Sequence, residues 1–250
     1  MKKILVLVVV LVCAISLKAQ EMKLPIIKAE VAQTQIMFEK SVWRRMDLKQ
    51  SQNKPFNSTN SEMSRFLVEA VQEGLLKPYQ TDSTNSILSD DAFQEQMSYK
   101  ETDFNGQEIS TPIRPTDFSI IYFKEDVVFD KNRSRLYWYI KTVSLALPGG
   151  IIPGVGFERK VAHFKYDDVI DVFRGAYADK AIWYNNQNQA QHRNFGDALE
   201  LRLFIAPIVK VSNAENLDLV SIEPDPFKRV LLQRKMEYDI MEYESELWEY

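Results

Sequence analysis

The clearest pattern along the chain is an apolar stripe with a helical period that begins at Met63. Apolar residues recur there every three or four positions as far as Leu75, and Pro78 follows. The spacing predicts an amphipathic helix that ends before the proline. A preceding helix is expected over 29–50, where Trp43 would lie among charged residues.

Polar caps predict three further helices. Ser89 is placed to cap a short helix, and Asn194 to cap a longer one that Pro207 should end or bend. An acid followed by a proline favours a last helix over 226–248. By contrast, 80–85 is polar and 99–115 holds an Asn-Gly pair and two prolines, which is typical of connecting loops.

The middle of the chain changes to a strand pattern. Residues 118–124 and 127–129 are β-branched and aromatic, 130–133 has turn chemistry, and 135–147 alternates one set of side chains against another. We expect a strand pair with one aromatic face buried and one open. Three more segments are strand candidates for the same sheet: 161–164, 169–173 and 181–184.

Together these elements predict an α+β fold with a central, mostly antiparallel sheet flanked by N- and C-terminal helices. The expected organisation is a signal peptide at 1–19, a helical N-terminal region at 20–115, a sheet-rich core with one helix at 116–225, and a C-terminal helix at 226–250.

The order of charge in the last helix is unusual, because bases come early and acids late. Lys228 and Arg234 lie near its start, whereas Glu237 to Glu249 includes six acids and no base. This order opposes the helix dipole. Either Glu237–Tyr250 docks on a basic groove of another subunit or partner, with Tyr243, Trp248 and Tyr250 as anchors, or it packs on its own domain.

The run FEKSVWRRMDL at Phe38–Leu48 combines a large aromatic ring with forked donors. Trp43, Arg44, Arg45 and Asp47 are candidate partner-binding residues, because Trp and Arg dominate interface hot spots. The alternative is an ordinary helix with Trp43 in the core and solvated arginines.

No motif predicts catalysis, a cofactor or a metal. His163 and His192 are 29 residues apart, no Gly-x-Ser-x-Gly elbow exists, and 148–157 lacks the Gly-Lys-Ser/Thr of a phosphate loop. That segment is better explained as an exposed loop between strands. The acids of the middle region are expected to be solvated, with a charged network at the hairpin formed by Asp126, Asp130, Arg133 and Arg135.

The N-terminus indicates export. Two lysines, an apolar run of 14 residues and a cleavage region ending near Ala19 have the layout of a signal peptide, and the run is too short to span a bilayer. Cys13 lies inside it and has poor lipidation context, so the mature chain has no cysteine. Loss of three lysines leaves 28 basic against 35 acidic residues, a net charge of about −7, which argues against nucleic acid as a partner.

Five stretches resemble the GldN family of gliding-motility proteins, called PorN in non-gliding relatives, which belongs to the type IX secretion machinery of Bacteroidetes. The match is weakest over 147–174. The stretches are FEKSVWRRMDL (38–48), LVEAVQEGLL (67–76), FKEDVVFDKNRS (123–134), AIWYNNQNQAQHRNFGDALELRLF (181–204) and SELWEY (245–250).

The resemblance implies a periplasmic, non-enzymatic structural component required for type IX secretion. Its implied partners are a GldK- or PorK-like outer-membrane lipoprotein, the periplasmic part of a GldM- or PorM-like motor protein, and further copies of itself within a ring. Membrane attachment would be indirect, at the inner face of the outer membrane. The alternative from the residues alone is a stand-alone periplasmic ligand- or carbohydrate-binding domain that uses Tyr137 and Tyr139.

Overall fold

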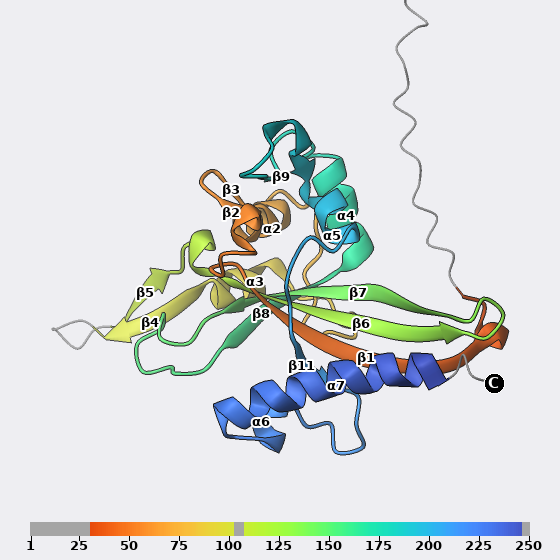
Figure 1. The fold of residues 1–250 in the computed structure, drawn as a ribbon. Coiled ribbons are helices and arrows are strands. Elements are labelled where there is room, and N and C mark those ends of the chain that lie inside the picture. The colour runs from red at the N-terminus through yellow and green to blue at the C-terminus, as the bar shows by residue number, and fades with distance from the viewer. Residues whose placement is uncertain (1–30, 103–107, 247–250) are drawn as a thin grey trace, which may run out of the picture. The chain divides into compact units, whose positions relative to one another are not determined.

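The structure is a computed structural model that describes residues 31–102 and 108–246. The chain divides into two units, Met1–Gln33 and Thr34–Tyr250, and of the first only residues 31–33 are described. The elements described below belong to the second unit (Figure 1), apart from the 3₁₀ helix η1 at the boundary. The predicted signal peptide lies outside the described residues.

A five-stranded antiparallel sheet forms the centre of the second unit. Its strand order is β11-β1-β6-β7-β8, so β1 pairs with β6 on one side and with β11 on the other. The α+β class and the antiparallel sheet are therefore confirmed. The strands are β1 (Ile36–Asp47), β6 (Ile120–Asp130), β7 (Arg135–Leu147), β8 (Arg159–Lys165) and β11 (Ile208–Val211).

Helices and short hairpins fill the connections. The helices are α2 (Met63–Gln72), α3 (Asp90–Gln96), α4 (Tyr166–Arg174), α5 (Phe195–Glu200), α6 (Leu219–Ile222) and α7 (Pro226–Glu246). The 3₁₀ helices are η1 (Gln33–Gln35), η2 (Lys54–Phe56), η3 (Pro115–Asp117) and η4 (Gln189–Gln191). The hairpins pair β2 (Asn57–Ser58) with β3 (Ser61–Glu62), β4 (Ser98–Thr102) with β5 (Glu108–Pro112), and β9 (Ile182–Trp183) with β10 (Arg193–Asn194).

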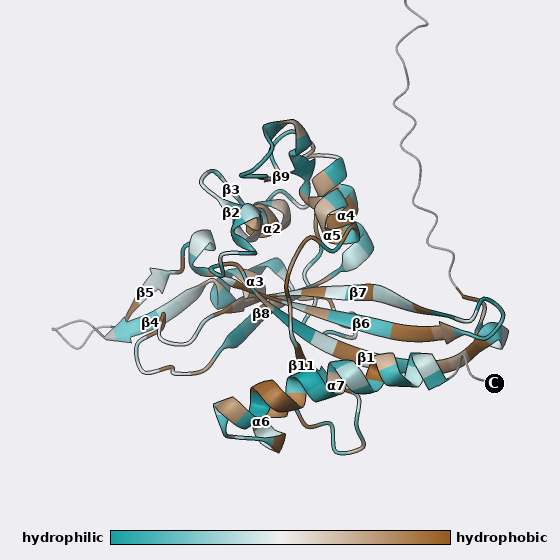
Figure 2. Cartoon of the chain, viewed as in Figure 1, coloured by the Kyte–Doolittle hydropathy of each residue, from teal (hydrophilic) through white to brown (hydrophobic). Residues whose placement is uncertain are grey.

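Two hydrophobic clusters lie on one face of the sheet, which we call the core face. The larger cluster joins α2, α4 and α5 to the sheet and buries eight phenylalanine side chains almost completely. The smaller one lies under α7 and includes Val42, Val127 and Ile240. Figure 2 shows hydrophobic stretches along β1, β6 and β7. Burial of each large apolar side chain stabilises the fold by roughly 1.5 to 3 kcal/mol, so the packed helices hold the sheet in shape.

The helix predicted over 29–50 is wrong, because Ile36–Asp47 is the strand β1. The apolar residues Val42 and Met46 are four positions apart, and this interval fits both a helical period and alternation in a strand. Backbone pairing decides between them: Trp43 lies opposite Lys124 of β6 and Lys210 of β11.

Several other expectations are confirmed. α2 begins at Met63, and Ser89 caps α3 by accepting a hydrogen bond from the amide of Ala92 at 3.3 Å. The strand pair is β6 and β7, joined by a tight turn in which Asp130 caps the amides of Asn132 and Arg133. α7 begins at the predicted proline.

Three assignments need correction. The segment 169–173 belongs to the helix α4, whose buried positions recur with a helical period. The connection expected at 99–115 contains the hairpin of β4 and β5. The strand β9, within 181–184, pairs with β10 in a separate two-stranded sheet. In addition, α5 ends at Glu200, well before Pro207, and Ile208 begins β11.

Within residues 31–102 and 108–246, none of the helices is both long and apolar enough to cross a membrane.

Candidate protein-interaction site

A network of charged side chains on the core face is centred on Glu125, whose carboxylate is fully buried. On β6 it stands between Phe123 of the larger cluster and Val127 of the smaller one. One oxygen accepts a hydrogen bond from Nε of Arg44 at 3.1 Å, and the other accepts from Nη1 of Arg202 at 2.9 Å. A buried carboxylate is costly unless it is paired, so the two guanidinium groups keep this charge inside the fold.

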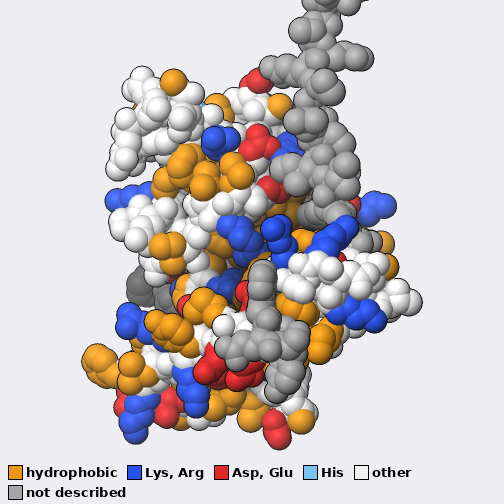
Figure 3. All heavy atoms as spheres, turned by 45° about the vertical axis from the view of Figure 1, so that its right-hand side comes forward, with side chains coloured by type: hydrophobic (Ala, Val, Ile, Leu, Met, Phe, Trp, Pro, Cys, Tyr) orange, Lys and Arg blue, Asp and Glu red, His pale blue; other side chains and the backbone are white. Residues whose placement is uncertain are grey.

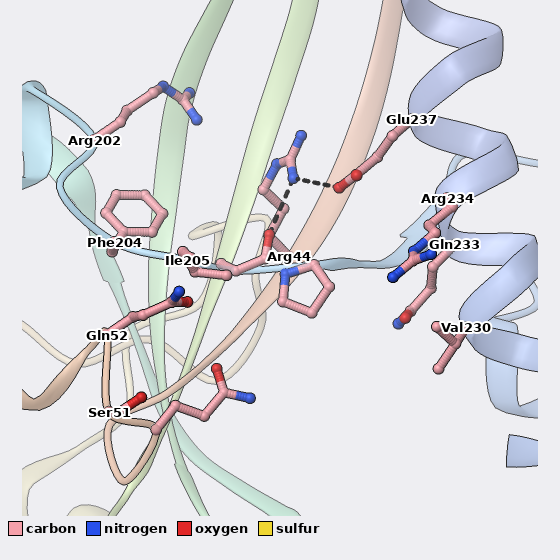
Figure 4. A pocket seen from close by; sticks show the side chains of 13 residues that line it. Arg44, Ser51, Gln52, Arg202, Phe204, Ile205, Val230, Gln233, Arg234 and Glu237 are labelled. Carbon is pink, nitrogen blue, oxygen red and sulfur yellow. Dashed lines mark hydrogen bonds and ion pairs between the residues drawn. The ribbon is translucent and has the colours of Figure 1, made fainter. Parts of the chain in front are cut away.

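Arg44 connects the buried carboxylate to the last helix. Its Nη1 donates to the carbonyl of Ala206 at 3.0 Å and to Glu237 of α7 at 3.2 Å (Figure 4). Its guanidinium carbon lies 4.9 Å from the centre of the Trp138 ring, in a cation–π contact. Only 15% of the side chain is exposed. Arg44 therefore joins β1, β6 and α7 from within.

Arg202 reaches the same carboxylate from the end of α5. Its φ is +52°, in the left-handed region that glycine favours at a helix end. Its Nη2 also donates to the carbonyl of Trp138 at 3.3 Å, which fixes the guanidinium at two points. The residue that pairs with Glu125 therefore has a strained backbone, at a position where glycine would adopt the same φ without strain.

A groove of about 840 Å³ opens beside this network, between α7 and the segment that leads into β11. Figure 4 shows α7 side chains on one side of the groove and the loop side chains on the other. Charged and amide groups alternate with apolar ones, so the groove suits a polar peptide segment. Its lining includes Gln52, Phe204, Ile205, Val230, Gln233 and Arg234.

Trp43 lies on the opposite face of the sheet, which we call the aromatic face and define by Trp43, Tyr122, Lys124, Tyr137, Tyr139 and Lys210. The Nζ atoms of Lys124 and Lys210 lie 5.5 and 4.8 Å from the centre of its ring. Its indole N–H donates to Asp82 at 2.6 Å. Burial alone would raise the pKa of Asp82, but the Trp43 hydrogen bond and Lys124 hold the pKa below its usual value. The half-buried ring is therefore fixed in orientation.

Arg45 and Tyr122 extend the aromatic face through Glu158. Nη2 of Arg45 donates to the Glu158 carboxylate at 2.7 Å, and the Tyr122 hydroxyl donates to the same group. Burial raises the pKa of Tyr122, and its hydrogen bond to Glu158 raises it further. Burial also acts to raise the pKa of Glu158, but the hydrogen bonds from Arg45 and Tyr122 outweigh this effect, so the pKa of Glu158 lies below its usual value. The cluster keeps a carboxylate charged and firmly held at the edge of the face.

Tyr137 and Tyr139 form the other end of the aromatic face. Their ring centres are 6.0 Å apart and the ring planes differ by 13°, so the two rings are stacked along β7. A polar hollow of about 420 Å³ lies nearby and is lined by residues that include Ser41, Asp82, Lys124 and Asp126. This face offers flat rings next to charged groups, which is the chemistry of a protein or sugar contact.

Ser144 and His163 form a buried polar pair beneath this face. Ser144 Oγ and His163 Nδ1 are 2.7 Å apart on neighbouring strands. Burial, and then Lys160, lower the pKa of His163 to about 4. A serine beside a histidine is part of a hydrolase triad, but only 2% of Ser144 is exposed. The pair links β7 to β8 as a hydrogen-bonded bridge.

Comparison with known families identifies the chain. The family described as "Gliding motility associated protein GldN" matches residues 31–249. The chain belongs to the GldN family. No curated protein matches it. Membership associates the chain with gliding motility and type IX secretion, in a family of structural components that is not known for enzymes.

In this GldN-family chain, the sequence-predicted partner residues do not form one surface. Trp43, Arg45 and Asp47 lie on one face of β1, and Arg44 points to the other, because neighbouring side chains of a strand alternate. Tyr243 packs against Phe38, with ring centres 4.6 Å apart. Trp248 and Tyr250 lie outside the described residues, so their role stays a prediction.

The C-terminal helix packs on its own domain as far as it is described. Ile240 is buried in the smaller cluster, Glu237 pairs with Arg44, and Glu244 accepts a hydrogen bond from the amide of Leu136 at 3.3 Å. Of the two interpretations of 237–250, this arrangement supports packing within the chain over docking on a basic groove elsewhere.

Sequence reasoning missed Glu125 and Arg202, and treated the acids of the middle region as solvated. Two of them are fully buried, Glu125 and Asp130. Asp130 pairs with Arg133 at 3.4 Å as expected, whereas Asp126 accepts from Ser41. A signal for Glu125 was present: in the alternation of β6 it occupies an inward position between Phe123 and Val127. In the described part of the chain, no group of His, Cys, Asp or Glu is arranged to hold a metal ion.

Proposed function

We propose that this GldN-family chain is a periplasmic structural component of the type IX secretion and gliding machinery. In this proposal it joins a GldK-like outer-membrane lipoprotein in a ring with further copies of itself, and contacts the periplasmic part of a GldM-like motor protein. The observation that carries the proposal is the family match over residues 31–249, which extends over the sheet, both clusters and the last helix.

The N-terminal sequence supports the proposed periplasmic location. Residues 1–19 have the pattern of a signal peptide, and the rest of the chain contains no cysteine. Attachment to the membrane through a lipoprotein partner agrees with the finding that no helix in the described ranges is suited to span a bilayer.

We assign partner binding to the aromatic face. Trp43 is half-buried, rigidly held through its indole N–H, and flanked by two lysines. Large rings that are fixed before binding lose little entropy on docking and dominate interface energetics. A partner segment with apolar and acidic side chains would match the ring and the lysines together. The side of the molecule that carries the β6–β7 turn also shows basic, acidic and apolar side chains close together (Figure 3).

The test is co-purification from the envelope with Trp43→Ala. We expect the variant to fold but to lose the lipoprotein, because truncation of a central hot-spot ring costs at least about 2 kcal/mol, a factor of about 30 in affinity. Tyr184→Ala is the matched control, since Tyr184 is 40% exposed in a different part of the fold. Retained co-purification of a folded Trp43→Ala protein would contradict the assignment.

If Trp43→Ala misfolds, the ring has a structural role, and a second variant decides. This variant is Tyr137→Ser, because Tyr137 lies on the same face two strands away and is only half-buried. Loss of the lipoprotein with Tyr137→Ser would still support the aromatic face, whereas full retention would refute it.

The stacked rings of Tyr137 and Tyr139 favour one alternative, a stand-alone carbohydrate-binding domain. Such a domain would run as a monomer and would bind a glycan through this platform. A chain that is extracted as a monomer, and whose glycan binding is lost with Tyr137→Ala, would support that function instead.

A further inference from the structure

The last helix turns an uncovered apolar stripe outwards. Phe227, Leu231, Tyr238 and Met241 are 86, 65, 66 and 52% exposed. Counted from Phe227 they stand at i, i+4, i+11 and i+14, with Arg234 at i+7, which is the alternating four–three spacing of a coiled-coil seam. α7 runs along the outside of the sheet (Figure 1), and Figure 2 shows hydrophobic segments in its first half.

The stripe is not the face by which α7 joins its own domain. Ile240 is 6% exposed and, with Met236, belongs to the smaller cluster under the helix. Tyr243 contacts Phe38 on the same inner side. A soluble protein rarely leaves a continuous row of large apolar side chains uncovered unless another molecule binds there.

The charges on the exposed side of α7 indicate which molecule binds to this stripe. Lys228 and Lys235 are exposed in the first half of the helix, whereas Asp239 and Glu242 are exposed in the second half. Acids near a helix C-terminus and bases near its N-terminus oppose the helix dipole. A second helix that packs antiparallel to the first would place opposite charges together, and their attraction would offset the unfavourable interaction with the helix dipole.

We propose that α7 of one chain pairs antiparallel with α7 of a second copy, about a two-fold axis near Met236. This register sets Leu231 against Met241 of the other copy and Arg234 against the ring of Tyr238. It also brings Lys228 within one helical turn of Glu242, and Lys235 within one turn of Asp239. The surface is self-complementary, as a two-fold contact requires.

A parallel arrangement would place lysines against lysines and acids against acids, so the charge pattern selects the antiparallel one. The seam from Phe227 to Met241 extends over about 21 Å of helix. A contact of this length falls at the small end of specific interfaces. The dissociation constant of the isolated dimer should therefore be in the micromolar range. The dimer should be stable only where other contacts hold many copies close together.

This inference deepens the proposed function, which includes self-association, and rests on it only for the place of the contact in a ring. The pairing of two purified copies needs no other protein. It can therefore fail while the lipoprotein contact of the aromatic face holds, and the reverse is equally observable.

The experiment is sedimentation equilibrium of the purified mature chain over a range of concentrations. We expect a monomer–dimer equilibrium. Phe227→Ser with Leu231→Ser should weaken it by about tenfold or more, because two large apolar side chains leave the seam. The control is Phe157→Ser, which removes another exposed phenylalanine, 70% exposed, from the loop between β7 and β8.

Charge exchange then tests the antiparallel register. One variant carries Lys228→Glu and Lys235→Glu, and the other carries Asp239→Lys and Glu242→Lys. Each alone should be monomeric, since like charges would face each other, and an equimolar mixture should dimerise again as a heterodimer. All four residues are on the outside of the helix, so both variants should keep the fold, as checked by circular dichroism.

A wild-type chain that stays monomeric at every concentration would overturn the proposal. So would a dimer that the seam variant leaves unchanged, or charge variants that dimerise alone as well as the wild type. A seam that instead binds a different protein from the envelope, with no self-association, would also refute the second copy as its occupant.

Discussion

The buried carboxylate of Glu125 makes the sharpest stability prediction for this fold. Glu125→Gln keeps the shape of the side chain but removes its charge, and leaves the guanidinium groups of Arg44 and Arg202 facing a neutral amide. Breaking a buried ion pair costs about 3 to 5 kcal/mol. The arginine side chains are 15% and 35% exposed, so water relieves part of this cost. We expect the free energy of unfolding to fall by about 3 kcal/mol.

Two substitutions of Arg202 separate the ion pair from the backbone. Arg202→Met leaves Glu125 bonded to Arg44 and should cost about 2 kcal/mol, the value of a hydrogen bond to a charged group. Arg202→Gly loses the same bonds but relieves the left-handed backbone at φ +52°, which is worth roughly 1 kcal/mol. The glycine variant should therefore be the more stable of the two.

The assay is urea unfolding followed by circular dichroism, with the free energy of unfolding and its slope fitted for each variant. Glu69→Gln is the control, because Glu69 makes a partly exposed ion pair with Arg65 at 3.3 Å on α2, and pairs near the surface contribute about 0.5 kcal/mol. If Glu125→Gln changed stability as little as Glu69→Gln does, the structural role of the buried network would be refuted.

Further predictions concern the hydrogen-bonded pair of Ser144 and His163 and the loop at 148–157. Because burial lowers the pKa of His163 to about 4 from an unfolded value of 6.5, the unfolded chain binds a proton that the folded chain does not. The free energy of unfolding therefore does not depend on His163 above pH 6.5, and it falls by about 3 kcal/mol as the pH falls towards 4. His163→Gln should remove this part of the acid dependence in urea titrations, whereas an unchanged dependence would contradict it. Gly149→Ala should destabilise the loop, since a Cβ there would lie 2.5 Å from the Gly156 carbonyl, while Gly156→Ala meets nothing within 4 Å. Equal melting temperatures of the two variants would show that the loop adapts.

Elements whose signals are local could be predicted from the sequence. The stripe of α2, the Ser89 cap, the Asp-Pro start of α7 and the β6–β7 turn each depend on neighbouring residues, and the structure contains all of them. Local propensity and tertiary packing agree at these positions.

The rest depends on pairing between segments that are far apart in the sequence. β1 was misassigned because an interval of four fits both a helix and a strand, and only its contacts with β6 and β11 select the strand. The error at α4 has a different cause: the buried residues Tyr166, Val169, Ile170 and Phe173 have the i, i+3, i+4 and i+7 spacing of a helix, but the window 169–173 is too short to show it.

The candidate site was predictable in its residue types but not in its geometry. The Trp-Arg-Arg run singled out Trp43, Arg44 and Arg45, but it was assigned to a helix and these residues lie on the strand β1. Alternation in a strand then divides the run, so that Arg44 stabilises the interior while Trp43 and Arg45 remain on the aromatic face. Asp82, which fixes the Trp43 indole, comes from a loop 39 residues away, and no local pattern could indicate that contact.

The most direct test of the central claim, that this chain acts as an assembled structural component, is the size and composition of the particle that carries it in mildly extracted envelopes. The account predicts a very large complex that contains an outer-membrane lipoprotein, and loss of that lipoprotein with Trp43→Ala. A chain that is extracted as a monomer, with no lipoprotein in the wild type, would contradict it.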